Sequence, residues 1–197
     1  MSDTLTLASW NVNSVNSRLE HILDWLERDP VDLLGLQETK CADVKFPFDA
    51  FIEAGWHVEH HGMPAYNGVA FITKKPLEHV VRGFPSGDLL DQPRVIATRI
   101  AGVDVINLYC PQGQDLESPK FKFKEDFYAE IANWLKTDFN PENPTVLFGD
   151  YNIAPEDIDT HSGELMAGRV MFTEMEHEWL KNITDLGYHD AFRACYP

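Results

Sequence analysis

The sequence predicts an α/β fold whose sheet component is mixed or mainly antiparallel. The chain opens with a strand, a helix and a second strand, and five short strands then run together before a long helix and a further strand. The opening segment is typical of α/β proteins, whereas five strands without intervening helices do not fit a purely doubly wound parallel sheet. A length of 197 residues is enough to bury a sizeable core and is most simply read as one domain.

The first part of the chain alternates between strand and helix. Residues 5–10 (LTLASW) are predicted to form a strand. Ser17 and Glu20 have the spacing of a capping box, and apolar residues at helical period follow until Pro30. Residues 31–36 (VDLLGL) predict a short buried strand, and the connection between the two strands is too long for a hairpin.

The middle of the chain is rich in β-strands, and its second half returns to helices. The predicted strands are residues 56–61, 68–73, 77–82, 94–100 and 103–109, with Ala101-Gly102 as a hairpin turn between the last two. Residues 120–138 are predicted to form a helix whose apolar stripe is Phe123, Phe127, Ile131 and Trp134. Residues 145–148 (TVLF) predict a buried strand. Thr173 and Glu176 form a second capping box, which opens a helix that ends near Gly187.

Composition excludes several classes of protein. With 16 basic and 32 acidic residues the net charge is −16, which excludes a basic-tail nucleic-acid binder. An enzyme that holds a phosphodiester through a metal and a few local cations is still compatible with this charge. The chain has neither a basic, apolar leader nor a run near the ~20 apolar residues of a membrane span, so we expect neither a signal peptide nor a membrane partner.

The cysteines favour a reduced protein. Cys41, Cys110 and Cys195 are far apart, odd in number and in no CxxC pattern, which argues against a disulfide framework or a zinc ribbon. We expect packed thiols in a cytoplasmic protein.

Polar side chains follow the apolar strands at the points where those strands end. Asn11 follows the first strand, Glu38 the second, and Asp150 and Asn152 the last, while Tyr109 ends the hairpin. Strand ends in α/β proteins hold functional groups on a rigid frame.

Carboxylate and amide oxygens suit Mg²⁺ or Mn²⁺ rather than zinc. A second carboxylate can orient a water for in-line attack, and a phenol and amides can hydrogen-bond the charge that develops on phosphorus. The alternative is that Glu38 and Asp150 are helix caps or solvated loop residues, but their joint occurrence with two asparagines favours a metal-dependent site.

Several segments carry a family resemblance. In order they are LASWNVNSVNSRL, LLGLQETK, YNGVAFITK, RGFP, VINLYCPQG, KFKFKEDFY and LFGDYNIAPED. Together they resemble the exonuclease III family of Mg²⁺-dependent AP endonucleases and 3′-exonucleases, within the endonuclease/exonuclease/phosphatase superfamily. The resemblance extends from Leu5 to about Arg193. GLQETK and GDYNIAP mark the superfamily, whereas YCPQG followed by KFKFKEDFY indicates the exonuclease III branch.

The resemblance implies a four-layer α/β sandwich, in which two packed mixed sheets are flanked by helices. It also implies a Mg²⁺-dependent DNA-repair nuclease, in which Mn²⁺ can replace Mg²⁺, that hydrolyses phosphodiesters at abasic sites or 3′ ends of double-stranded DNA. Such a protein is expected to be cytoplasmic and monomeric, without an obligate protein partner. The alternatives are a superfamily phosphoesterase acting on RNA, inositol phosphates or lipid headgroups, and an inactive fragment that retains metal or DNA binding.

The resemblance also assigns roles to single residues. The implied metal set is Asn11, Glu38, Asp150 and Asn152, with Glu38 as the principal ligand. Asp150 would orient and deprotonate the attacking water, Asn152 would hold the phosphate or a metal-bound water, and Tyr109 would hydrogen-bond the phosphate. The expected DNA contacts are Lys40, Tyr66, Asn67, Gln112, Lys120 and Lys122. For the KFKFK segment, the alternative is a helix start with lysines outside and phenylalanines in the core.

One departure from the family concerns the C-terminus. The family continues past a DAFR-like segment, here His189–Arg193, to further strands and a terminal SDH motif that this sequence lacks. We therefore expect residues 1–197 to be a single, C-terminally incomplete domain. None of the eight histidines inherits the SDH role. His57, His60 and His61 are expected at the surface, and His161 is expected to be structural or exposed to solvent.

Overall fold

The computed structural model describes residues 4–90 and 92–196, which divide into two compact units. The first unit comprises the chain up to Tyr109 together with Pro144–Asp150, and it contains both β-sheets. The second unit comprises Cys110–Asn143 and the chain from Tyr151 onward, and it is helical.

The first sheet has the strand order β1-β2-β4-β3. It is built from β1 (Leu7–Asn11), β2 (Leu33–Gln37), β3 (His57–His61) and β4 (Val69–Thr73). β1 and β2 run parallel, whereas β4 is antiparallel to both β2 and β3. The predicted strands in this part of the chain are confirmed, and the sheet is mixed.

The second sheet has the order β5-β6-β7-β8. Its strands are β5 (Glu78–Arg82), β6 (Val95–Ile100), β7 (Val103–Tyr109) and β8 (Thr145–Asp150). β7 and β8 are parallel and the other pairs are antiparallel, so this sheet is also mixed. At the predicted hairpin between β6 and β7, Ala101 and Gly102 have φ values of 50° and 82°, which fit a tight turn with two positive φ angles.

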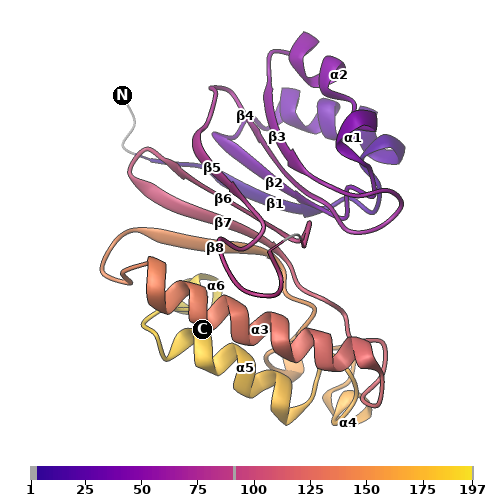
Figure 1. The fold of residues 1–197 in the computed structure, drawn as a ribbon, viewed down its shortest axis with the longest axis vertical. Coiled ribbons are helices and arrows are strands. Elements are labelled where there is room, and N and C mark those ends of the chain that lie inside the picture. Colours follow the sequence, from indigo (N-terminus) through magenta and orange to yellow (C-terminus); the bar gives the residue numbers. More distant parts are fainter. Residues whose placement is uncertain (1–3, 91, 197) are drawn as a thin grey trace. The chain divides into compact units, whose positions relative to one another are not determined.

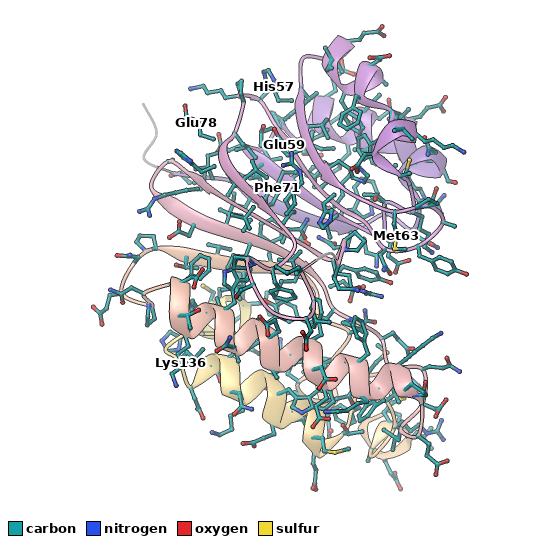
Figure 2. All side chains as sticks on the ribbon, viewed as in Figure 1. His57, Glu59, Met63, Phe71, Glu78 and Lys136 are labelled. Carbon is teal, nitrogen blue, oxygen red and sulfur yellow. The ribbon has the colours of Figure 1, made fainter. Side chains whose placement is uncertain are left out.

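The two sheets pack together around one part of the core. Phe71, labelled in Figure 2, packs with buried residues of both sheets, among them Leu33, Ile96 and Val105. Its ring meets that of Phe148 edge-on, with 6.4 Å between centroids. Gly35 lies in the middle of β2, where a Cβ atom would be 2.0 Å from the Phe148 ring. β2 is buried on both faces, which explains its continuous apolar sequence.

Two helices of the first unit cover the other face of the first sheet (Figure 1). They are α1 (Val15–Arg28) and α2 (Phe48–Glu53), with the short 3₁₀ turn η1 (Asp43–Lys45) between them in sequence. Ile22, Leu26 and Phe51 bury against Leu34 and other residues of that face. α2 was not predicted, because six residues are too few to show a helical period.

The N-terminus of α1 differs from the prediction. Ser14, not Ser17, is the N-cap, and its hydroxyl accepts a hydrogen bond from the Ser17 amide at 3.4 Å. The amides of Ser14 and Val15 donate to the carbonyls of Glu38 and Thr39 at 2.7 and 3.0 Å. These long-range bonds start the helix earlier than the local pattern indicated.

In the second unit, α3 (Pro119–Asp138) and α5 (Glu174–Thr184) pack side by side (Figure 1). Tyr128 of α3 stacks on Trp179 of α5 with 5.8 Å between ring centroids. The predicted capping box of Thr173 and Glu176 begins α5. The remaining elements are η2 (Asp157–Asp159), α4 (Gly163–Met166) and α6 (Ala191–Cys195).

Two expectations for the second unit are wrong. On α3, Phe127, Ile131 and Trp134 of the predicted stripe are buried, but Phe123 is only half-buried, and Phe121 and Lys124 are buried at that end of the helix instead. Cys195 is exposed, although Cys41 and Cys110 are buried as expected. Within the described residues, no helix has the length and apolar character needed to cross a membrane.

Candidate active site

The polar strand ends of the first unit meet at one edge. Because β1 and β2 are parallel, Asn11 lies opposite Gln37, one residue before Glu38. Because β7 and β8 are parallel, Tyr109 lies opposite Asp150. The carboxyl ends of parallel strands are where α/β proteins gather functional side chains.

Asn11 joins the two candidate carboxylates. Its Nδ2 donates to Glu38 Oε1 and to Asp150 Oδ2, each at 2.8 Å. Its Oδ1 accepts a hydrogen bond from the Asn13 amide at 3.1 Å. As oriented, Asn11 therefore presents nitrogen to the carboxylates and holds side chains of two different sheets together. The structure thus brings three of the four proposed metal residues to one point.

Glu38 lies in a turn held on both sides by main-chain bonds. Its φ of 53° takes it out of the extended strand conformation, its carbonyl accepts from Ser14, and the next amide donates to Gly68 at 3.1 Å. Lys40 Nζ lies 2.8 Å from Glu38 Oε2. Burial opposes ionisation, but the hydrogen bonds from Asn11, Lys40 and Tyr109 and the Lys40 charge outweigh it, so the pKa of Glu38 is lowered. Glu38 is a carboxylate at neutral pH.

Tyr109 supplies a proton donor to the same site. Burial, followed by the nearby Glu38 charge, raises its pKa to about 12. The Arg94 guanidinium lies 4.7 Å from the centre of the Tyr109 ring and its Nη1 donates to the Tyr109 carbonyl at 3.1 Å. The ring is therefore fixed, and its hydroxyl keeps its proton at neutral pH.

A buried polar network beneath these residues was not recognised from the sequence. Gln37 Nε2 donates to Asn107 Oδ1 at 2.6 Å, and Asn107 Nδ2 donates to the carbonyls of Leu36 and Ala70 at 3.0 and 3.1 Å. Gln37 and Asn107 are 1% and 0% exposed. The bonds tie β2 to β7 next to Glu38 and Tyr109. In the sequence, this network is indicated by one amide side chain in each of the apolar runs LLGLQ and VINLY, because a buried amide needs hydrogen-bond partners.

His60 is buried, so the expectation that it lies at the surface is wrong. Its Nε2 lies 2.9 Å from Thr39 Oγ1 and its Nδ1 lies 2.8 Å from Asp43 Oδ1. Burial lowers the pKa of His60 to about 4 against the opposing effect of Asp43. The neutral ring thus anchors Thr39, the residue after Glu38. His57 and His161 are exposed as expected.

Gln112 and Asn152 belong to the second unit and are held there by other contacts. Asn152 has a positive φ of 51°, and its Nδ2 donates to the Cys110 carbonyl at 2.9 Å. Gln112 Oε1 accepts from the Gln114 amide at 2.8 Å, which shapes the loop before α3.

The proposed DNA-contacting residues differ in their exposure and in their contacts with the rest of the protein. Tyr66 is 69% exposed, and the neighbouring Asn67 carbonyl accepts from the Lys40 amide at 2.8 Å. Lys120 is exposed near the N-terminus of α3. Lys122 is exposed but donates to Glu125 and Asp126 at 2.9 and 2.7 Å, so part of its charge is neutralised within the helix.

The donor set of the first unit fits a hard divalent cation. In the described part of the chain, no three His, Cys, Asp or Glu side chains gather in a metal-binding arrangement. Two carboxylates held together by one amide match Mg²⁺, which takes one or two protein carboxylates and keeps several waters. The same set does not fit zinc, which is bound by cysteine and histidine in most sites.

Comparison with known proteins gives a consistent result. Residues 8–192 match the profile of the endonuclease/exonuclease/phosphatase family. Exodeoxyribonuclease III of Haemophilus influenzae is 35% identical over 200 residues, which cover 96% of this chain and 75% of that protein.

Two solved structures have the same fold. An AP endonuclease from Archaeoglobus fulgidus superposes with a TM-score of 0.92 at 36% identity, over 97% of this chain and 74% of that one. A 3′ phosphatase from Neisseria bound to a product DNA hairpin gives a TM-score of 0.89 at 37% identity, again over 97% and 74%. The predicted α/β class with two mixed sheets and helices is confirmed.

Proposed function

Because the chain belongs to the endonuclease/exonuclease/phosphatase family, we propose that it is a metal-dependent DNA-repair nuclease of the exodeoxyribonuclease III type. The observation that carries this proposal is the pair of carboxylates, Glu38 and Asp150, held at 2.8 Å from one Asn11 amide nitrogen. Such a pair suits metal-assisted hydrolysis of a phosphodiester, with one carboxylate for the metal and one for the attacking water.

Glu38 is the principal metal ligand in this proposal, with Asp150 beside it. The lowered pKa of Glu38 keeps it ionised, as a ligand for a hard cation must be. Bound there, Mg²⁺ would supply Lewis-acid stabilisation of charge on the phosphoryl oxygens, and Mn²⁺ is the expected substitute. Asn11 positions the two carboxylates by its shared hydrogen bonds, and rotation of its amide would turn an oxygen to the cation.

The protein side chains provide the remaining chemistry. Asp150 orients the attacking water and takes its proton, which is general-base catalysis. Tyr109, protonated at neutral pH, donates to a non-bridging phosphate oxygen as charge develops there. Asn152, two residues after Asp150, and Gln112 are proposed to hold the scissile phosphate.

The proposed substrate is double-stranded DNA with an abasic site or a 3′ end. Lys40, Tyr66, Asn67, Lys120 and Lys122 are proposed contacts to its backbone, because cations and amides position a duplex through its phosphates. With a net charge of −16 these few local contacts replace a general electrostatic attraction. We further propose a monomer, folded as one domain, that works in the cytoplasm.

A substrate panel tests this function. The chain is incubated with Mg²⁺ and, in separate reactions, an abasic-site duplex, a recessed 3′ end, a duplex with a 3′-phosphate, an RNA and an inositol phosphate. Cleavage of one or more DNA substrates that stops on addition of a chelator is expected. Turnover of only the RNA or the inositol phosphate would favour another phosphoesterase of the family, and no turnover of any substrate would leave a binding fragment.

A further inference from the structure

α3 carries a fully buried lysine, Lys124. Its side chain is 0% exposed and faces that of Glu176 on α5, which is also 0% exposed, with 2.5 Å between Nζ and Oε1. Lysine is almost never fully buried unless it is paired, because transfer of its charge out of water is unfavourable. The position therefore calls for a specific explanation.

Besides its ion pair with Glu176, Lys124 makes two hydrogen bonds to Asn152 and Gln112, the candidate phosphate-binding residues. Nζ donates to the main-chain carbonyls of Asn152 and Gln112, at 2.6 and 3.3 Å. One turn further along α3, the Tyr128 hydroxyl donates to the Tyr151 carbonyl at 2.5 Å. Side chains four residues apart on one helix thus hold two successive carbonyls of the segment after β8.

The Asn152 main chain has a conformation that these bonds help to hold. Its φ of 51° lies in the left-handed region, which asparagine adopts more readily than most other residues but less readily than glycine. Its side-chain amide is oriented by the bond to the Cys110 carbonyl. With the carbonyl held by Lys124 and the side-chain nitrogen held by Cys110, Asn152 is fixed at both its main chain and its side chain.

Glu176 in turn fixes the lysine. Its carboxylate accepts from the Met171 amide at 2.9 Å, from the Thr173 amide at 3.1 Å and from the Thr173 hydroxyl at 2.8 Å, in addition to Lys124. The carboxylate belongs to the capping box of α5 and has little freedom to move. Since well-packed apolar residues often stabilise a core as well as a buried ion pair does, stability alone does not account for the pair.

We propose that Lys124 and Glu176 are positioning residues for the nuclease reaction, and that they act by holding Asn152 and Gln112 in place. This inference rests on the proposed function for its catalytic part. Its structural part, that the pair restrains segments 110–116 and 151–156, stands independently. The pair itself touches no substrate.

The test uses a variant that removes both charges at once. Lys124→Met alone would leave Glu176 buried without its cation, which is strongly destabilising, so the double variant K124M/E176Q is the informative one. The matched control is K181M/D185N, which removes the exposed pair between Lys181 and Asp185 on α5. All are compared with the parent by melting temperature, by kcat and KM on an abasic-site duplex with Mg²⁺, and by hydrogen exchange.

The double variant is expected to melt within about 3 °C of the parent. Its kcat should fall about 10- to 100-fold, as for a small misplacement of a positioned group, with KM within about threefold. Hydrogen exchange should accelerate in segments 110–116 and 151–156, and the control should match the parent in every measurement. Parental kcat and parental exchange in the double variant would overturn the inference, as would a kcat loss that only follows the unfolded fraction.

A second variant keeps the proposal testable should the double variant not fold. Lys124→Gln retains a neutral N–H donor, so it should retain more kcat than Lys124→Met at the same folded fraction, and equal values would contradict a role for the carbonyl bonds. Should the parent show no nuclease activity, the proposed function fails. The exchange rates of the two segments then decide the structural claim alone.

Discussion

Glu38 and Asp150 accept hydrogen bonds from the same amide nitrogen, Nδ2 of Asn11, at 2.8 Å each. Glu38 directly follows β2 of the first sheet, whereas Asp150 ends β8 of the second sheet, 112 positions further along the chain, so tertiary structure brings the two carboxylates together. Two carboxylates around one point repel each other, and a divalent cation relieves that repulsion.

Glu38→Gln is expected to weaken Mg²⁺ binding about tenfold or more while the protein stays folded, since an amide keeps the shape of the ligand but loses its charge. Calorimetric titration with Mg²⁺ and a thermal melt measure the two effects. Glu78→Gln, at an exposed position on β5 that is labelled in Figure 2, is the control and should bind Mg²⁺ like the parent. Unchanged Mg²⁺ affinity in the Glu38 variant would remove that residue from the metal site.

Asp150→Asn is expected to slow the chemical step by about 10²–10⁴-fold, because the general base is lost. DNA binding should survive, since the amide is neutral and adds no repulsion toward phosphate. Single-turnover cleavage of an abasic-site duplex measures the first effect, and fluorescence anisotropy with the same duplex measures the second. A single-turnover rate within tenfold of the parent would refute the assigned role.

Tyr109→Phe is expected to lower kcat about 10²–10³-fold, as loss of one positioned donor to a developing oxyanion does. The fold should be retained, because the ring and its contact with Arg94 remain. Steady-state kinetics on an abasic-site duplex check the loss, and circular dichroism checks the fold. Equal kcat values for the variant and the parent would show that the Tyr109 hydroxyl does not contact the reacting phosphate.

Much of the fold could be predicted because its elements are encoded locally. β2 is an apolar run that is buried on both faces, and Thr173 and Glu176 form the predicted capping box at the start of α5. Asn11, Glu38 and Asp150 were recognisable because each follows an apolar strand. Their convergence depends on the parallel pairing of β1 with β2 and of β7 with β8.

The roles of Lys124 and His60, which support residues of the candidate site, could not be predicted because they depend on partners distant in the sequence. Lys124 sits in a run of alternating lysines and phenylalanines, and what sets it apart from the exposed Lys120 and Lys122 is its burial against Glu176, 52 residues away, and against the Asn152 and Gln112 carbonyls. His60 is likewise one of three nearby histidines, and its burial and its contacts with Thr39 and Asp43 depend on residues distant in the sequence. The local pattern also predicts Phe123 in the core, but Phe123 is half-buried and the neighbouring Lys124 is buried, with its charge paired with Glu176.

His60 is expected to make the stability of the protein depend on pH. Burial holds its pKa at about 4, against an ordinary value of 6.5, while Asp43 opposes this shift and His61 and Arg82 add to it. Between these values the unfolded chain binds a proton that the folded protein does not, so the contribution of His60 is fully present above pH 6.5 and is lost as the pH falls toward 4. Melting temperatures of His60→Gln from pH 4 to 7 should therefore fall less steeply than those of the parent, whereas the exposed His57→Gln, at the position labelled in Figure 2, should follow the parent. If melting temperature depends on pH with the same slope in the parent and in His60→Gln, His60 has the same pKa in the folded and unfolded states. That result would contradict a buried neutral ring that contacts Thr39.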